Sequence, residues 1–252
     1  MSEGGLTARR PYPWRLFAAL VLAGTVAAIL VVPYQLALQP AVLERFPLPL
    51  VVASAVLNAA LLLALAAGVG IAAAERTTGL RFEALRALVY GGDVRAALAR
   101  AEPLVAVALG GAAALVLIAL DLAFAAVFGR SNVTAAARPG PLLGFLASFY
   151  GGITEELLTR LGLMSVIAYV LARLHIRAAV PIAIVIAAVL FAAGHLPAAA
   201  SLAPLTAPAV ARVLVLNAIG GLVFGWLYWR RGLEAAMIAH FCADLVLHVL
   251  IA

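Results

Sequence analysis

The run LVAVALGGAAALVLIALDLAFAAVF at Leu104–Phe128 contains a single ionisable residue, Asp121. A helix needs about 20 mostly apolar residues to cross the hydrocarbon core of a bilayer. This run exceeds that length, so we predict that it forms a transmembrane helix.

Six other runs of the chain have a comparable length and composition. They are Leu16–Leu36, Leu50–Ala74, Leu142–Leu171, Ala178–Leu196, Val210–Trp229 and Leu233–Ile251. The third of these is overlong, and Gly151 and Gly152 are expected to break it into a short entering piece and a main helix that begins near Ile153. Loops containing proline or glycine separate the runs, and one such loop is predicted from Pro197 to Pro208. We therefore predict an all-α polytopic transmembrane bundle of about seven to eight spans.

The overall composition also indicates a membrane protein. Hydrophobic residues make up 66% and charged residues 11% of the 252 residues, whereas soluble domains are nearer half apolar and a quarter charged. The 17 basic residues are all arginines between apolar runs, where they determine topology. We therefore expect membrane lipid and no nucleic acid as a partner, despite the net charge of +6. The arginine-only, alanine- and leucine-rich composition suggests a GC-rich prokaryotic genome and a multi-pass protein of the inner cell membrane.

The arginines also predict the orientation of the chain. With the N-terminus inside, twelve arginines lie in inner segments, namely Arg9, Arg10, Arg15, Arg76, Arg81, Arg86, Arg95, Arg100, Arg173, Arg177, Arg230 and Arg231. Three lie in outer loops, namely Arg45, Arg130 and Arg138. This distribution favours a cytoplasmic N-terminus. The charged segment Glu75–Glu102 falls on the same side, as either an amphipathic helix at the membrane interface or a solvated loop helix.

Ionisable residues inside spans are costly and usually face a bundle interior or water, so each is a functional candidate. In the motif Glu155-Glu156-x-x-x-Arg160, Glu156 and Arg160 are four residues apart and share a helix face, so they can pair. Glu155 lies about 100° away around the helix and is left available as a base. Two carboxylates sharing one arginine in a purely structural pocket explain this motif equally well.

Histidines occur in two later spans. Phe191 precedes His195 by one turn at the end of the fifth span, where a lone histidine is more often structural. In the last span His240, Asp244 and His248 line one helix face. Asp244 can orient the His240 ring or share a water or metal with it. For His248 we expect a structural role, because it lies near the end of the chain.

A free glutamate, two histidines and an aspartate on three hydrophobic helices can activate a water and stabilise an oxyanion. The same residue types can bind zinc, and the ligands would then be Glu155, His195, His240 and Asp244. Both alternatives follow from the residue types.

Three motifs follow one another in successive spans: EExxxR at 155–160, FxxxH at 191–195 and HxxxD at 240–244. They resemble the CPBP family of CAAX proteases and bacteriocin-processing (Abi-like) proteins, which includes the type II CAAX prenyl endopeptidases. The stretch GLVFGWLYWRRG at 221–232 also resembles the family pattern. The resemblance covers about residues 140–250.

The sequence shows no internal repeat and no low-complexity tail, so we predict one membrane domain over residues 1–252. Residues 1–139 would supply the N-terminal spans and the interfacial helix, and residues 140–252 the catalytic core in the last four spans.

The resemblance also implies roles for the first two motifs. Glu155 looks like the catalytic glutamate that activates water, with Glu156 and Arg160 as its supporting pair. His195 looks like the second catalytic residue beside the water, with Phe191 in support.

His240 and Asp244 look like the pair that stabilises the tetrahedral oxyanion. The family often has asparagine at the last position, and an ionised aspartate cannot donate a hydrogen bond. Asp244 would then be protonated, orient His240 or ligate a metal. The resemblance is compatible with a metal-free glutamate mechanism and with a zinc metalloprotease, so no cofactor is firmly implied. The aspartate makes zinc a more attractive alternative in this chain.

We therefore predict an intramembrane endopeptidase that hydrolyses a peptide bond in a membrane-associated protein or peptide. A prenylated CAAX protein is not the expected substrate, because that modification is eukaryotic. One alternative is a non-catalytic membrane scaffold or immunity protein of the same fold. Another is an ion-coupled transporter with a relay through Asp121, Glu155 and His240, which the lack of interrupted spans in matching halves disfavours.

Overall fold

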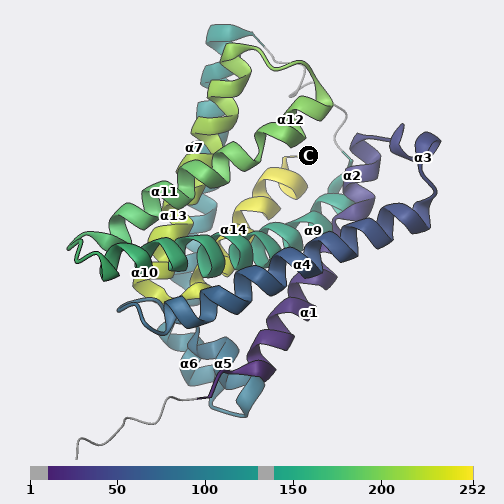
Figure 1. Ribbon diagram of the computed structural model, residues 1–252. Coiled ribbons are helices and arrows are strands. Elements are labelled where there is room, and N and C mark those ends of the chain that lie inside the picture. The colour runs from purple at the N-terminus through teal and green to yellow at the C-terminus, as the bar shows by residue number, and fades with distance from the viewer. Residues whose placement is uncertain (1–10, 130–138, 252) are drawn as a thin grey trace, which may run out of the picture.

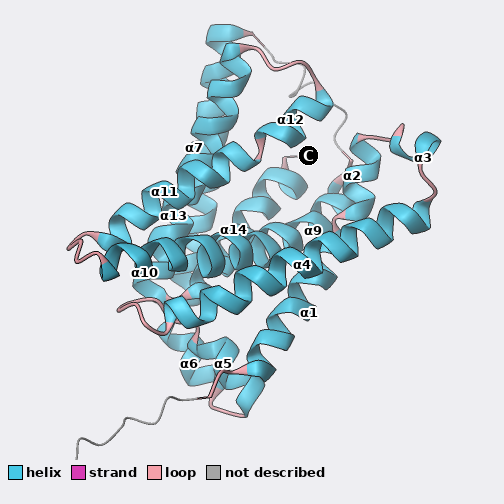
Figure 2. Ribbon diagram, in the orientation of Figure 1, coloured by secondary structure: helices cyan, strands magenta, loops and turns pink. Residues whose placement is uncertain are grey.

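The computed structural model describes residues 11–129 and 139–251, which form helices and loops with no β-strand (Figure 1, Figure 2). The helices are α1 (Trp14–Leu30), α2 (Val32–Leu38), α3 (Val42–Arg45), α4 (Leu48–Ala74), α5 (Glu83–Tyr90), α6 (Val94–Arg100), α7 (Pro103–Phe128), α9 (Pro141–Phe149), α10 (Ser165–Arg173), α11 (Ala179–Gly194), α12 (Leu196–Leu202), α13 (Ala207–Arg231) and α14 (Leu233–Leu245). The π-helical segments are η1 (Tyr150–Glu155), η2 (Leu157–Met164) and η3 (Val246–Leu250). The predicted all-α bundle is confirmed.

Within the described ranges, six helical stretches are long and apolar enough to cross a membrane. They are Trp14–Leu38, Leu48–Ala74, Pro103–Phe128, Ala179–Leu202, Ala207–Arg231 and Leu233–Leu250. The protein is therefore a multi-pass membrane protein. The remaining predicted span, Leu142–Leu171, lies within a continuous helical stretch over residues 141–173, which is about 50 Å long at 1.5 Å per residue.

The orientation predicted from the arginines depends partly on residues outside the described ranges. These are Arg9, Arg10, Arg130 and Arg138.

The expected break at Gly151 and Gly152 is wrong. Both glycines lie in η1, where the helix widens to π-type hydrogen bonding and then continues through η2 into α10. Their small size serves close packing instead, because a Cβ on Gly152 would lie 2.8 Å from the Cβ of Phe241 on α14. Such wide turns redirect side chains without ending a helix, and they are frequent at functional sites.

The long helix over residues 141–173 runs through the middle of the bundle, with α4 on one side and α14 on another (Figure 1). Glycine allows α4 to approach the central helix closely, because a Cβ on Gly70 of α4 would overlap the carbonyl of Leu161 in η2. Small residues permit such contacts between membrane helices, where burial from water contributes little to association. Thr154 adds a polar contact, because its hydroxyl donates a 2.8 Å hydrogen bond to the carbonyl of Gly24 in α1. These contacts fix the position of η1, from which the first candidate glutamate projects.

The charged segment Glu75–Glu102 forms two short helices, α5 and α6, and not one interfacial helix. They lie at the end of the bundle where α13 turns into α14 (Figure 1). The Arg81 guanidinium donates to the Arg230 carbonyl at 2.8 Å, and the backbone N–H of Leu233 donates to the Arg81 carbonyl at 2.9 Å. The segment therefore braces the start of α14, which carries the candidate histidine.

The loop predicted from Pro197 to Pro208 is also shorter than expected. Helix α12 occupies most of its first half, and α13 begins at Ala207. Both prolines lie in the first turn of a helix, where the missing N–H removes no hydrogen bond.

Candidate active site

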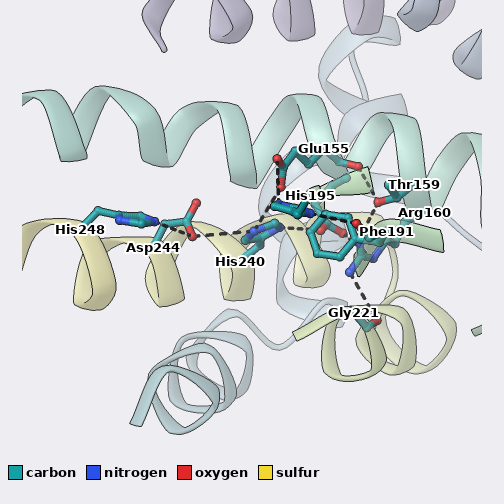
Figure 3. Close-up of polar contacts among 10 residues, drawn as sticks. Glu155, Thr159, Arg160, Phe191, His195, Gly221, His240, Asp244 and His248 are labelled. Atoms are coloured by element: carbon teal, nitrogen blue, oxygen red, sulfur yellow. Dashed lines mark hydrogen bonds and ion pairs between the residues drawn. The ribbon is translucent and has the colours of Figure 1, made fainter. Parts of the chain in front are cut away.

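The structure brings all the predicted site residues together inside the bundle, and Figure 3 shows most of them. The central helix supplies Glu155, Glu156 and Arg160, the α11–α12 region supplies Phe191 and His195, and α14 supplies His240 and Asp244.

One half of the cluster is buried. His240 Nδ1 donates a 2.7 Å hydrogen bond to Glu156 Oε1, and Arg160 Nε lies 3.3 Å from Glu156 Oε2. The side chains of Glu156, Arg160 and His240 are 0%, 2% and 7% exposed. Glu156 Oε2 has no aligned hydrogen-bond donor among the described residues, so Arg160 acts on it through charge alone. Glu156 therefore links the arginine to the histidine, a connection that the sequence motif did not indicate.

Two aromatic rings enclose this half of the cluster. The Arg160 guanidinium lies 4.9 Å from the centre of the Phe191 ring and 5.5 Å from that of Phe224. The same Phe224 ring stacks on His240 with the centroids 4.4 Å apart and the planes at 19°. The negative ring faces stabilise the cation, so Phe224 holds both the arginine and the histidine in place. Phe224 belongs to the 221–232 pattern, but its role could not be predicted from that pattern.

The other half of the cluster is open. Glu155 Oε1 lies 3.8 Å from His195 Nε2, and Glu155 Oε2 lies 3.7 Å from His240 Nε2. The side chains of Glu155 and His195 are 19% and 33% exposed. These separations are too long for direct hydrogen bonds, and polar groups this far apart are commonly bridged by water.

Both imidazoles present the same nitrogen to Glu155. His195 Nδ1 lies 2.8 Å from the carbonyl oxygen of Phe191, which can only accept, so this nitrogen carries a hydrogen. His240 Nδ1 carries one for the same reason, because its partner Glu156 is a carboxylate. The hydrogen-bond network thus assigns Nδ1–H to both rings and directs both Nε2 atoms toward Glu155.

Asp244 lies one turn beyond His240, with Oδ1 at 3.8 Å from His240 Nε2. Its other carboxylate oxygen faces Gly151 so closely that a Cβ there would overlap it. The same Cβ would lie 3.1 Å from His240 Nε2. Gly151 is therefore a site residue that sequence reasoning treated only as a helix breaker.

A cavity of about 570 Å³ opens onto Glu155 and His195. Its walls come from the α1–α2 region, the π-helical part of the central helix and the α11–α12 region. Most of the lining is apolar, and Tyr34 and Gln35 of α2 and Gln39 just after it add polar groups. Such a cavity suits an apolar ligand with a few polar groups near the carboxylate.

Two residues singled out in the sequence lie apart from Glu155. Asp121 of α7 forms an ion pair with Arg212 of α13. This pairing gives Asp121 a charge partner outside the predicted proton relay. His248, in the segment η3 that continues α14, lies 4.0 Å from Asp244 and extends the row of polar side chains formed by His240 and Asp244 (Figure 3).

The segment that contains the three motifs also matches a known protein family. Residues 137–246 match the family described as type II CAAX prenyl endopeptidase, Rce1-like. This segment belongs to that family. The predicted membership of the CPBP and CAAX-protease group is thereby confirmed. No curated protein and no solved structure matches the chain.

The residue types of this cluster suit zinc, but two of its contacts are wider than the ligand separations around a bound zinc ion. Tetrahedral zinc with bonds of about 2.0–2.1 Å brings its ligand atoms to about 3.3 Å from one another. The Glu155–His240 and His240–Asp244 contacts are wider, at 3.7 and 3.8 Å. In the part of the chain that the structure describes, no three His, Cys, Asp or Glu side chains are placed to hold a metal ion.

Proposed function

We propose that this protein is an intramembrane endopeptidase in which Glu155 activates a water molecule for attack on a peptide bond. The observation that supports this most strongly is the position of Glu155, at the cavity and between the Nε2 atoms of two histidines. The Rce1-like match supports protease activity at the level of the family.

The first step is attack by water. A water held between Glu155 and His195 gives one proton to the Glu155 carboxylate as its oxygen bonds to the carbonyl carbon of the substrate. Glu155 suits this role because it is an acceptor at the cavity and lies beyond hydrogen-bond distance of either histidine. His195, fixed through its bond to the Phe191 carbonyl, orients the water with its Nε2 lone pair.

The second step is stabilisation of the tetrahedral oxyanion. His240 lies among three carboxylates, at 2.7 Å from Glu156, 3.7 Å from Glu155 and 3.8 Å from Asp244. In the proposed step His240 is doubly protonated, and its Nε2–H donates to the oxyanion. Asp244 then acts as a counter-charge to His240, so it need not be a hydrogen-bond donor. This accounts for an aspartate where the family often has asparagine.

Collapse of the intermediate completes the reaction. The carbon–nitrogen bond breaks, and the proton held by Glu155 passes to the departing amine nitrogen. The products are a carboxylic acid and an amine, and Glu155 returns to its ionised form. The overall reaction consumes one water molecule for each peptide bond.

We propose a membrane-associated protein or peptide as substrate, because the apolar cavity lies within a bundle of membrane helices. We also propose a cytoplasmic N-terminus on the basis of the arginine distribution, which would put α5 and α6 on the cytoplasmic side.

The proposal can be tested with purified protein in detergent and fluorescence-quenched apolar peptides, with and without a farnesylated CAAX end. Wild type should cleave at least one peptide, and Glu155→Gln should lower kcat at least 100-fold. Glu83→Gln is a matched control, because Glu83 pairs with Arg100 on the surface. Equal rates for wild type and Glu155→Gln, or no cleavage of either peptide by wild type, would overturn the proposal.

A further inference from the structure

The row of polar side chains formed by His240 and Asp244 on α14 continues to His248 and then to Tyr34 on α2. His248 Nε2 lies 4.0 Å from Asp244 Oδ1. The Tyr34 hydroxyl lies 3.5 Å from His248 Nδ1, and the two rings meet edge to face with centroids 5.8 Å apart. Neither Tyr34 nor His248 is needed to explain the water-activating half of the site.

The carboxylate of Asp244 is surrounded on several sides. Its Oδ1 lies between two imidazole nitrogens, at 3.8 Å from His240 and 4.0 Å from His248. Its Oδ2 faces Gly151. Nitrogens of the two histidines therefore flank one carboxylate oxygen.

Tyr34 also contributes to the wall of the cavity that contains Glu155. Its side chain therefore takes part in two environments, the substrate cavity and the contact with His248. A ligand in the cavity can touch the Tyr34 ring while the hydroxyl remains on His248.

We propose that Tyr34 and His248 are positioning residues that hold the Asp244 carboxylate beside His240 and connect its orientation to the cavity wall. The kinetic part of this inference rests on the proposed endopeptidase function.

The donor and acceptor atoms can be followed from Tyr34 through His248 to Asp244. If the Tyr34 O–H donates to His248 Nδ1, the hydrogen of the neutral ring lies on Nε2, which faces Asp244. At 4.0 Å this contact is electrostatic, and such contacts often shorten when substrate binds. The carboxylate is thus held near His240 by an N–H dipole instead of turning toward Glu155, which it would repel.

The backbone and the side chain of His248 make different contacts. The carbonyl of His248 meets Gly144 of α9, where a Cβ would overlap it. This tight contact depends on the backbone, so a side-chain substitution such as His248→Gln leaves it intact. A purely structural role for His248 would then predict little change in catalysis.

The kinetic test compares His248→Gln, Tyr34→Phe and Asp244→Asn, alone and combined, on the peptide that wild type cleaves best. We expect His248→Gln to lower kcat about 10-fold with KM changed less than 2-fold, as is usual for groups that orient a functional side chain. In the Asp244→Asn background the same change should have no further effect. An equal loss in both backgrounds, or no loss in either, would overturn the inference while leaving the proposed function standing.

A second measurement does not depend on a substrate. The chain has four histidines, so ¹⁵N-histidine NMR of the full-length protein can follow each imidazole. Tyr34→Phe should shift the His248 nitrogen signals, and Asp244→Asn should shift those of both His240 and His248. The His175 signals serve as an internal control. Unchanged His248 signals in both variants would contradict the contact chain, even if wild type cleaved no peptide.

Discussion

Glu155 and Glu156 are neighbours in the chain but lie in opposite halves of the site. Glu156 is fully buried, and its two oxygens face His240 and Arg160 at 2.7 and 3.3 Å. Glu155 lines the cavity, and its nearest histidine nitrogens are 3.7 and 3.8 Å away. If Glu155 is the base, as we propose, partner distance and access, and not residue type, separate the structural carboxylate from the reactive one.

Glu155 is the last residue of the π-helical segment η1, and Glu156 lies between η1 and η2. A buried ion pair is costly to break, because one partner is left charged and unpaired. A carboxylate at a cavity can change its protonation without disturbing the packing. We therefore expect changes at Glu155 to affect activity and changes around Glu156 to affect stability.

The largest effect is expected at the reactive carboxylate. Glu155→Asp retains the base but withdraws it by one methylene, and a displacement of about 1 Å can cost about 100-fold in rate. Glu155→Gln removes the base and should cost more, up to about 10⁴-fold. Steady-state kinetics on a cleavable peptide would show this order. If Glu155→Asp were less active than Glu155→Gln, Glu155 would not be the base.

Substitution of Arg160 tests how much the buried half of the site contributes to stability. Arg160→Met removes the arginine partner of Glu156 and should lower the free energy of unfolding by about 3–5 kcal/mol. Combining it with Glu156→Gln removes the unpaired charge and should recover part of that loss. Denaturation in a single detergent would compare the two variants. A double variant less stable than Arg160→Met would show that the ion pair is not the main interaction.

Substitution of Gly151 tests its close contact with Asp244 and His240, where the two halves of the site meet. Gly151→Ala places a methyl group against Asp244 and His240, and overpacking of this kind typically costs about 1–3 kcal/mol. We expect an activity loss as well, because the methyl displaces both side chains. Gly111→Ala in α7 is a matched control, since a Cβ there meets nothing within 4 Å. Similar activity for both glycine variants would contradict the proposed contact.

The smallest effect is expected far from the cluster. Arg100→Ala removes an exposed pair with Glu83, at 2.6 Å, between α5 and α6. Surface pairs of this kind contribute about 0–1 kcal/mol. The unfolding midpoint and the peptide cleavage rate should both stay close to wild type. A large activity loss would mean that α5 and α6 support the site more directly than their contacts indicate.

The fold was largely predictable because the bilayer sets a length and a composition for each span. Leu104–Phe128 and Leu50–Ala74 both correspond to spans within a few residues of their predicted ends. The central helix was harder to predict, because its π-helical turns depend on contacts such as that of Gly152 with Phe241 on α14. In the sequence, a glycine pair suggests a flexible break in the helix. The close packing of α14 explains why residues without a side chain are needed there.

The grouping of the candidate residues was predictable from three motifs at helical spacing, but their partners were not. Pairing of Glu156 with Arg160 follows from a four-residue separation within one helix. The bond from His240 to Glu156 joins residues 84 positions apart, and no local pattern encodes it. The same holds for Phe224 on His240 and for Tyr34 on His248, which involve different helices.

The most direct measurement of the division between the two glutamates is the unfolding midpoint of purified Glu155→Gln and Glu156→Gln in the same detergent. We predict that Glu155→Gln unfolds within about 2 °C of wild type. Glu156→Gln should unfold roughly 6 °C lower or more, because Arg160 and His240 lose their shared partner. Equal midpoints for the two variants, or a larger drop for Glu155→Gln, would contradict the division between the two glutamates.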